Sequence, residues 1–519
     1  MRKQSFLQGA LILMLAGLVN RMLGFVLRII IVRTIGDEGL GLFQMIYPLF
    51  MTLLLISTAG FPVAISKLIP ERMAHNDLRG SYNLLKISLV FTFLMSSIII
   101  MIVYFSADLI TTRIYSDSRT YIILLSILPA LLISSLAACF RGFFQGMHTM
   151  MPTALSQITE QASRLLATLM IINAVAYMGL KYQAAGIAIG ISIGELCGLL
   201  LLIILFLYTL LNSHENKKKL GQKISQNVRH NYSRDFKVIA GLAIPITMGR
   251  IINSLMMSGE AILIPRQLEL SGLSISDATA LYGQLSGMVE QVLFLPTVIT
   301  IALTISLVPN ISDAQARNNM KKIKSNYQDV IRISCYLGFP ITVIFYRMGS
   351  DICNLLFGYP EAGQLLAAMA FASTFIYYLQ VSHGMLNGLG KPHLSVINLS
   401  IGSLVKLIGI FYLTRQPIGI YGAAVSIGLG ITLSALLNFI SIGHNIGYDI
   451  NIIKSFIKPF TASSALFISI PFLQNMINST FFNIGNRLET ILILLILVCS
   501  YLLLMIFMKA ITREDLNRF

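Results

Sequence analysis

The stretch Gly9–Val32, GALILMLAGLVNRMLGFVLRIIIV, is apolar enough to cross a bilayer as one helix, yet it contains two arginines. A membrane-spanning helix needs about 20 predominantly apolar residues. Arg21 and Arg28 are two helical turns apart, and Gly17 and Gly24 lie on the same face of the helix. An arginine at bilayer depth costs roughly 2.5–3.5 kcal/mol on insertion scales, and it is tolerated when it faces a protein interior or a water-filled cavity. This helix is therefore expected to form one wall of a cationic cavity.

These arginines predict an anionic ligand. Arginine stays charged, and its planar guanidinium donates paired hydrogen bonds to phosphate or carboxylate oxygens. Arg250, much later in the chain, is the expected partner of Arg21 from the second half of the protein. Two other readings stay open at this point, because the arginines could instead reach the membrane surfaces or pair with interior acids.

Composition places the whole chain in the membrane. Of its 519 residues, 55% are hydrophobic and 12% are charged, and the mean hydropathy is +0.77, whereas soluble proteins carry about 25% charged residues. An all-α polytopic membrane protein with about 14 transmembrane helices follows. The expected spans are 9–34, 42–69, 82–106, 119–140, 150–178, 183–211, 238–264, 279–308, 328–347, 362–387, 393–414, 417–443, 454–477 and 487–509.

Three internal matches, in the same order, predict two related six-helix lobes. The matched pairs are the four-residue repeats of small residues Gly186–Gly198 and Gly422–Ser434, the motifs Arg141–Gly146 and His383–Gly388, and the segments Ile65–Pro70 and Ile305–Pro309. Parallel repeats of this kind are typical of transporters whose halves rock about a central site. The predicted organisation is an N-terminal lobe at 1–211, a basic cytoplasmic linker at 212–237, a C-terminal lobe at 238–444, and two further helices with a cytoplasmic tail at 445–519.

Charge in the loops predicts the topology. Lys and Arg accumulate on the cytoplasmic side of membrane proteins, and placing both termini in the cytoplasm puts most of the loop Lys and Arg there, including Lys217–Lys219. The net charge of +16 therefore needs no nucleic-acid partner. The expected location is the cell membrane, where the basic linker could also touch anionic lipid headgroups.

Nothing in the sequence indicates a metal site, a cofactor or catalysis. The five cysteines show no metal-ligand spacing, and the histidines form no paired motif. A membrane glycosyltransferase would need a catalytic acid on a long outer loop, and the predicted outer loops are short. We therefore expect a protein that is not an enzyme.

Acids inside the expected spans have two predicted roles. Glu160 and Arg164 are spaced i, i+4, which is typical of a structural ion pair within one helix. Glu195 and Glu290 lack an obvious local partner, and Glu260 shares a helix face with Arg250. Acids at such costly positions are candidates for coupling a proton or sodium ion to transport.

Several short motifs together resemble the multidrug/oligosaccharidyl-lipid/polysaccharide exporter superfamily, on the branch that includes polysaccharide transporters and lipid II flippases. They are Lys3–Gly9, Arg21–Phe25, Gly36–Leu42, Pro62–Leu68 and Arg141–Gly146. In this comparison Arg21 matches the first of two cavity arginines in the first helix of lipid II flippases. Their second arginine follows after six residues, whereas here that position is Leu27 and the next arginine is Arg28.

The resemblance implies two lobes, alternating access, and export of an undecaprenyl-diphosphate-linked oligosaccharide. For relatives in spore-forming bacteria it implies lipid II for cortex peptidoglycan, with membrane lipids and cortex synthases as partners. Two alternatives remain: a non-transporting scaffold for synthases, and a cation-coupled multidrug antiporter. A scaffold would tolerate loss of the interior arginines, and an antiporter for cationic drugs would need an acidic cavity instead.

Overall fold

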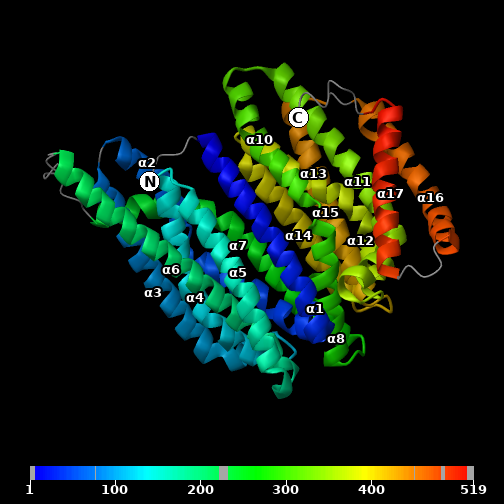
Figure 1. Cartoon of the computed structure of the whole chain (residues 1–519), viewed down its shortest axis with the longest axis horizontal. Coiled ribbons are helices and arrows are strands. Elements are labelled where there is room, and N and C mark those ends of the chain that lie inside the picture. The colour runs from blue at the N-terminus through cyan, green and yellow to red at the C-terminus, as the bar shows by residue number, and fades with distance from the viewer. Residues whose placement is uncertain (1–5, 76, 221–231, 449–450, 481–485, 511–519) are drawn as a thin grey trace. The chain divides into compact units, whose positions relative to one another are not determined.

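The computed structural model describes residues 6–75, 77–220, 232–448, 451–480 and 486–510, and these form helices and connecting turns without a β-strand. The helices are named in chain order (Figure 1). They are α1 (Phe6–Thr58), α2 (Phe61–Ala74), α3 (Leu78–Leu109), η1 (Ile110–Ile114), α4 (Thr120–Gly146), α5 (Met151–Ala174), η2 (Ala176–Met178), α6 (Leu180–Leu220), α7 (Tyr232–Leu270), α8 (Ile275–Tyr282), η3 (Gly283–Val289), α9 (Glu290–Phe294), α10 (Thr297–Ala316), α11 (Met320–Phe357), α12 (Ala362–Met369), η4 (Ala370–Ala372), α13 (Ser373–Gly388), α14 (Pro392–Leu413), α15 (Ile420–Ile446), η5 (Ile453–Ile457), α16 (Lys458–Thr480) and α17 (Asn486–Phe507).

The all-α polytopic prediction is confirmed. Within the described residues, 11 helices are long and apolar enough to cross a membrane, or 12 if the bent pair Tyr232–Ala243 and Thr247–Leu270 is one span. The count is lower than expected partly because the first two expected spans are counted together as one stretch, Leu11–Ala74, despite breaks inside it. In addition, α5 is long enough but less apolar, since it carries Glu160 and Arg164 among other polar residues.

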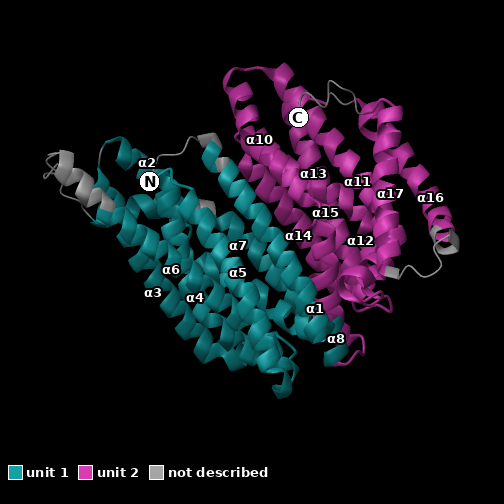
Figure 2. Ribbon diagram, viewed as in Figure 1, with its two compact units in different colours: residues 1–262, 275–280 teal, residues 263–274, 281–519 magenta. Residues whose placement is uncertain are grey.

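The chain divides into two compact units (Figure 2). Unit 1 contains residues 1–262 and 275–280, and unit 2 contains residues 263–274 and 281–519. Both flanks of the expected basic linker are helical, since α6 continues to Leu220 and α7 begins at Tyr232, while residues 221–231 lie outside the described chain. The assignment of two repeated lobes to residues 1–211 and 238–444 stays a prediction.

Each unit has its own apolar core. In unit 1 the core joins α2, α3, α4, α6 and the start of α7, and the rings of Phe61 and Phe91 stack with centroids 4.0 Å apart. In unit 2 it joins α10, α11, α13 and α15, and the buried hydroxyls of Tyr327 and Tyr378 lie 3.0 Å apart. Pairing these hydroxyls with each other avoids the cost of a buried polar group without a partner.

Gly36 separates the first two expected spans within α1. Its backbone dihedrals, φ 74° and ψ −174°, are not helical, and a residue with a Cβ adopts this conformation only with strain. The expected boundary between residues 34 and 42 therefore coincides with a real break in the helix. A second break, at Ala59 and Gly60, separates α1 from α2 with positive φ at both residues.

The small-residue repeats predicted from the sequence form close helix contacts in both units. In unit 1 the stripe on α6 faces α5, and a Cβ at Gly194 would lie 2.7 Å from the carbonyl oxygen of Glu160. In unit 2 the stripe on α15 faces α14, and a Cβ at Gly430 would lie 2.7 Å from the carbonyl oxygen of Gly402. Small residues let the backbones approach this closely.

The second and third sequence matches also contact each other in the same way within each unit. A Cβ at Gly146 of α4 would lie 3.3 Å from the carbonyl oxygen of Ile65 of α2, and one at Gly388 of α13 would lie 3.1 Å from the carbonyl oxygen of Val308 of α10. Segments far apart in the sequence thus repeat one local packing arrangement. This parallel supports the proposed internal repeat without fixing its boundaries.

We expect Gly190→Leu to destabilise the protein, because a Cβ there would lie 2.0 Å from Thr168 Oγ1 of α5. Overpacking of this kind costs about 1–3 kcal/mol, which would appear as a lower midpoint of thermal unfolding. Gly241→Leu is the matched control, since a Cβ at exposed Gly241 meets nothing within 4 Å. Equal midpoints for the two variants would contradict the close packing of α5 and α6.

Candidate functional site

The arginine face of α1 lies against α5 in unit 1. A Cβ added to Gly24 would lie 3.3 Å from Gln161 Nε2 of α5, which fixes the direction of the predicted stripe. Arg21 and Arg28, one turn before and one turn after Gly24, are both half-buried, and both interact with other groups of the protein. The interior placement expected from the sequence is therefore favoured over two side chains that extend freely to the surface.

Four charged side chains meet where α4, α5 and α6 pack together. We call Arg141, Glu160, Arg164 and Glu195 the ion cluster. Glu160 lies 2.7 Å from the Arg141 guanidinium and 2.5 Å from that of Arg164. Glu195 lies 3.5 Å and 3.4 Å from the same two guanidinium groups. Each arginine therefore bridges both acids.

The ion cluster corrects two expectations from the sequence. Glu195 does have charged partners, because helix packing brings Arg141 and Arg164 to it from α4 and α5. Arg141 follows the last residue of the expected span 119–140, but it lies within α4 and its side chain is only 19% exposed. The sequence did contain a signal for this. Glu160 and Glu195 are interior acids on neighbouring spans, and Arg164 alone cannot balance both charges, so a second cation had to be nearby.

Tyr47 links the ion cluster to α1. Its side chain lies within electrostatic range of Arg28, Arg164, Glu160 and Glu195. Arg28 and the ion cluster therefore act on one region of unit 1. Here the structure brings together residues that the sequence assigned separately to anion binding, ion coupling and structural pairing.

Unit 2 has an uncharged network at the junction of its corresponding helices. Asn398 of α14 donates to Asn438 and to Ser441 of α15, both at 2.9 Å. Asn438 donates in turn to Ser382 of α13, also at 2.9 Å. By the internal matches, α13, α14 and α15 correspond to α4, α5 and α6. One packing arrangement thus holds two acids and two arginines in unit 1, and amides and hydroxyls beside Lys406 in unit 2.

The remaining predicted site residues belong to other helices, α7 and α9. On α7 the side chains of Arg250, Asn253 and Met257 are exposed, while Glu260 is 8% exposed. The predicted face of α7 is therefore divided between an exposed part and a buried acid. Glu290 is half-buried and begins α9 in unit 2. Both glutamates interact with other groups of the protein.

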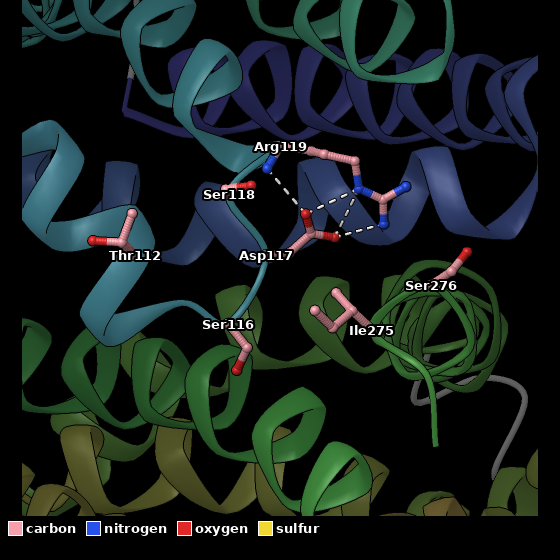
Figure 3. A pocket seen from close by; sticks show the side chains of 7 residues that line it. All are labelled: Thr112, Ser116, Asp117, Ser118, Arg119, Ile275 and Ser276. Carbon is pink, nitrogen blue, oxygen red and sulfur yellow. Dashed lines mark hydrogen bonds and ion pairs between the residues drawn. The ribbon is translucent and has the colours of Figure 1, made fainter. Parts of the chain in front are cut away.

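A second polar cluster joins three distant segments of unit 1. Figure 3 shows the residues of two of them, around Arg119 and around Ser276. The Arg119 guanidinium binds Asp117 through Nε at 2.9 Å and Nη2 at 2.6 Å, and it binds Glu38 through Nη1 at 2.6 Å. From α8, Thr279 donates to Asp117 at 3.3 Å and Ser276 donates to Glu38. These contacts attach residues 275–280 to the rest of unit 1.

An open cavity of about 440 Å³ adjoins the Arg119 cluster. It is lined by Thr112, Ser116, Asp117, Ser118, Arg119, Ile275 and Ser276. The hydrogen bond to Asp117 raises the pKa of the Arg119 guanidinium above its usual value. The cation therefore persists at any physiological pH, which suits a permanent structural contact.

The family model described as "Polysaccharide biosynthesis protein" matches residues 6–273. The chain belongs to this family. Stage V sporulation protein B of Bacillus subtilis (strain 168) is 31% identical over 100% of this chain and 98% of that protein. Lipid II flippase MurJ of the same organism is 24% identical over 90% of this chain and 88% of its own length.

Solved structures share the fold of this family member. The structure "Lipid II flippase MurJ, inward closed conformation" has a TM-score of 0.69 and 15% identity, and covers 95% of this chain and 98% of that chain. An inward-facing multidrug resistance MATE family transporter of the MOP superfamily has a TM-score of 0.66 and 14% identity, and covers 82% of this chain and 94% of that chain. These likenesses confirm a polytopic helical membrane fold.

We expect Glu160→Gln to destabilise the protein, because it removes the acid that makes the two shortest contacts of the ion cluster. Breaking a buried ion pair from one side costs about 3–5 kcal/mol, so membrane abundance and the unfolding midpoint should both fall. Glu71→Gln is the control, since Glu71 is exposed in the same unit. Normal abundance of the Glu160 variant would exclude a structural role for that acid.

We expect Arg119→Ala to loosen α8, because it leaves Asp117, which is 2% exposed, without its main hydrogen-bond donor. The loss of stability should be about 1–3 kcal/mol, with faster hydrogen exchange in residues 275–282. Arg119→Lys should restore only part of the protection, because an ammonium lacks the forked guanidinium geometry. Arg113→Ala is the control, because Arg113 is exposed, and it should leave hydrogen exchange in residues 275–282 unchanged. Exchange in Arg119→Ala as slow as in the native chain would contradict this account.

Proposed function

We propose that this protein moves an undecaprenyl-diphosphate-linked oligosaccharide across the cell membrane by alternating access. The observation that carries the proposal is the half-buried arginine face of α1, packed against α5 beside further arginines in the same unit. Guanidinium groups held away from bulk water suit an anion, and they form paired hydrogen bonds with phosphate oxygens. A cationic drug would instead require an acidic surface.

In this proposal Arg21, Arg28 and Arg250 bind the lipid diphosphate. Arg21 and Arg28 follow one face of α1, so they can engage successive phosphate groups. Arg250, exposed on α7 of unit 1, is the second contributor that the sequence suggested. The polyprenyl tail would stay among membrane lipids, because exposing such an apolar chain to water in the cavity is unfavourable.

Peptidoglycan precursor for the spore cortex is the substrate we propose. The names of two relatives, a stage V sporulation protein and a lipid II flippase, support this choice. Cortex synthases would then be the consumers of the exported precursor. Both termini are proposed to lie in the cytoplasm, in keeping with the distribution of Lys and Arg.

Coupling to a cation gradient is assigned to interior acids. Glu195, Glu260 and Glu290 remain the candidates, and of these Glu195 is connected to the proposed anion site through Tyr47. Transport of this kind changes the location of the lipid without making or breaking its covalent bonds. We therefore propose a transporter rather than an enzyme.

The test is reconstitution of the purified protein in vesicles with labelled lipid II, scored by its accessibility on each leaflet. Arg21→Ala should reduce the transport rate about tenfold or more, because charge-assisted hydrogen bonds contribute roughly 1.5–3 kcal/mol each. Arg21→Lys should recover part of the rate. The abundance of Arg21→Ala should stay near normal, since this variant removes an intramembrane charge.

Arg113→Ala is the matched control, because Arg113 is exposed at the end of η1 and should transport normally. An Arg21→Ala protein that is well expressed and fully active would overturn the proposed anion site. Retained cortex synthesis in the same variant would favour the scaffold alternative.

A further inference from the structure

We propose that Glu195 is a proton-controlled switch, and that its protonation leaves one uncompensated positive charge on Arg141 and Arg164, which then binds the lipid diphosphate beside Arg28. The inference rests on the proposed function and adds two ligands and a form of regulation to it. The chemical step is simple: the Glu195 carboxylate takes one proton from water, and both arginines keep theirs. No other reactant is required.

Contact lengths distinguish the two acids of the ion cluster. Glu160 holds both arginines with contacts of 2.7 and 2.5 Å, whereas the contacts of Glu195 are 3.5 and 3.4 Å. A charge-assisted hydrogen bond normally lies near 2.7–2.9 Å. Glu195 is therefore the weakly held acid, and neutralising it loses less interaction free energy with the arginines than neutralising Glu160 would.

Charge balance decides what protonation does. With both acids ionised, the ion cluster pairs two cations with two anions. Protonation of Glu195 leaves one positive charge in excess, at a position where Coulomb interactions are stronger than in water. A diphosphate can restore the balance by supplying the negative charge that the Glu195 carboxyl group has lost.

The arginines retain the capacity to bind such a ligand. Each side chain is 19% exposed, so neither is sealed in the core. Among the described residues, Nε of Arg141 and Nε of Arg164 are buried without a hydrogen-bond partner. Buried polar atoms are usually satisfied, and two unused donors indicate a site that can be rearranged.

The groups that face Glu195 from the packed helices are limited in kind. They are Ser134 and Arg141 from α4, Glu160 and Arg164 from α5, and Tyr47 from α1, with Arg28 acting on the same tyrosine. The cations among them attract an anion once Glu195 is neutral. Glu160 stays paired and keeps the helices together in both states.

Unit 2 shows that the packing itself does not require the acids of the ion cluster. Its junction of α13, α14 and α15 is held by Asn398, Asn438 and Ser382 through neutral hydrogen bonds. Lys406 packs against Gly430 as Arg164 packs against Gly194, and Gly402 stands where Glu160 stands in unit 1. Buried ion pairs are rarely more stabilising than well-packed neutral groups, so the acid at this position of unit 1 points to a role beyond holding helices.

The experiment measures binding of undecaprenyl diphosphate to the full chain in nanodiscs between pH 5.5 and 8. Because the ligand also titrates, each variant is compared with the native chain at the same pH. At pH 8, Glu195→Gln should bind about tenfold more tightly than the native chain, and at pH 5.5 the two should converge. Glu361→Gln, an exposed acid in unit 2, should match the native chain throughout.

Arg141→Gln is the second variant. It keeps the contact between Glu160 and Arg164 and should weaken binding at pH 5.5 about tenfold, with a smaller effect at pH 8. Arg141→Lys should recover part of that loss and report on folding. Glu195→Gln that binds no more tightly than the native chain at pH 8, or an Arg141→Gln effect independent of pH, would overturn the switch.

The flip assay separates this inference from the proposed function. If the pH-dependent difference in binding is present but the native chain moves no lipid II, the switch stands and the transport proposal fails. If the native chain transports lipid II, but Glu195→Gln and the native chain bind undecaprenyl diphosphate equally tightly at every pH, the transport proposal stands and the switch fails.

Discussion

The packing of unit 1 depends on one constraint: charged side chains that lie away from water must neutralise each other. Arg141, Glu160, Arg164 and Glu195 reach one point from three helices, and any one of them left alone there would be costly. Their contacts therefore require α4, α5 and α6 to keep one relative position. The glycine stripe on α6 serves the same arrangement, because it lets α5 approach closely enough for Glu195 to reach the arginines.

Comparison of the two units separates scaffold from site. The close contacts of α6 with α5 and of α15 with α14 repeat the same small-residue pattern, as an internal duplication would produce. The polar groups carried by that scaffold differ, with acids and arginines in unit 1 and amides beside Lys406 in unit 2. A shared backbone arrangement has thus been given different chemistry in its two copies, which is how a pseudo-symmetric protein can carry an asymmetric site.

The sequence predicted the fold well because the bilayer leaves few choices. Long apolar runs must be helices, and the boundary expected between residues 34 and 42 contains the break that the structure shows at Gly36. The contact between Glu160 and Arg164 followed from spacing within one helix. Arg141 was missed because its partners lie on other helices, and no local pattern reveals which faces meet. The Arg119 cluster was missed for the same reason, since Glu38 and Ser276 are 238 positions apart.

The Arg119 cluster also bears on how the chain is made. Glu38 and Asp117 emerge early in synthesis, but Thr279, which contacts Asp117, lies 162 residues further along the chain. The early helices must therefore be inserted while this end of unit 1 is still incomplete. Its final contacts form only after α7 has been inserted and α8 has been synthesised. Completion of the first unit therefore depends on a segment from the middle of the polypeptide.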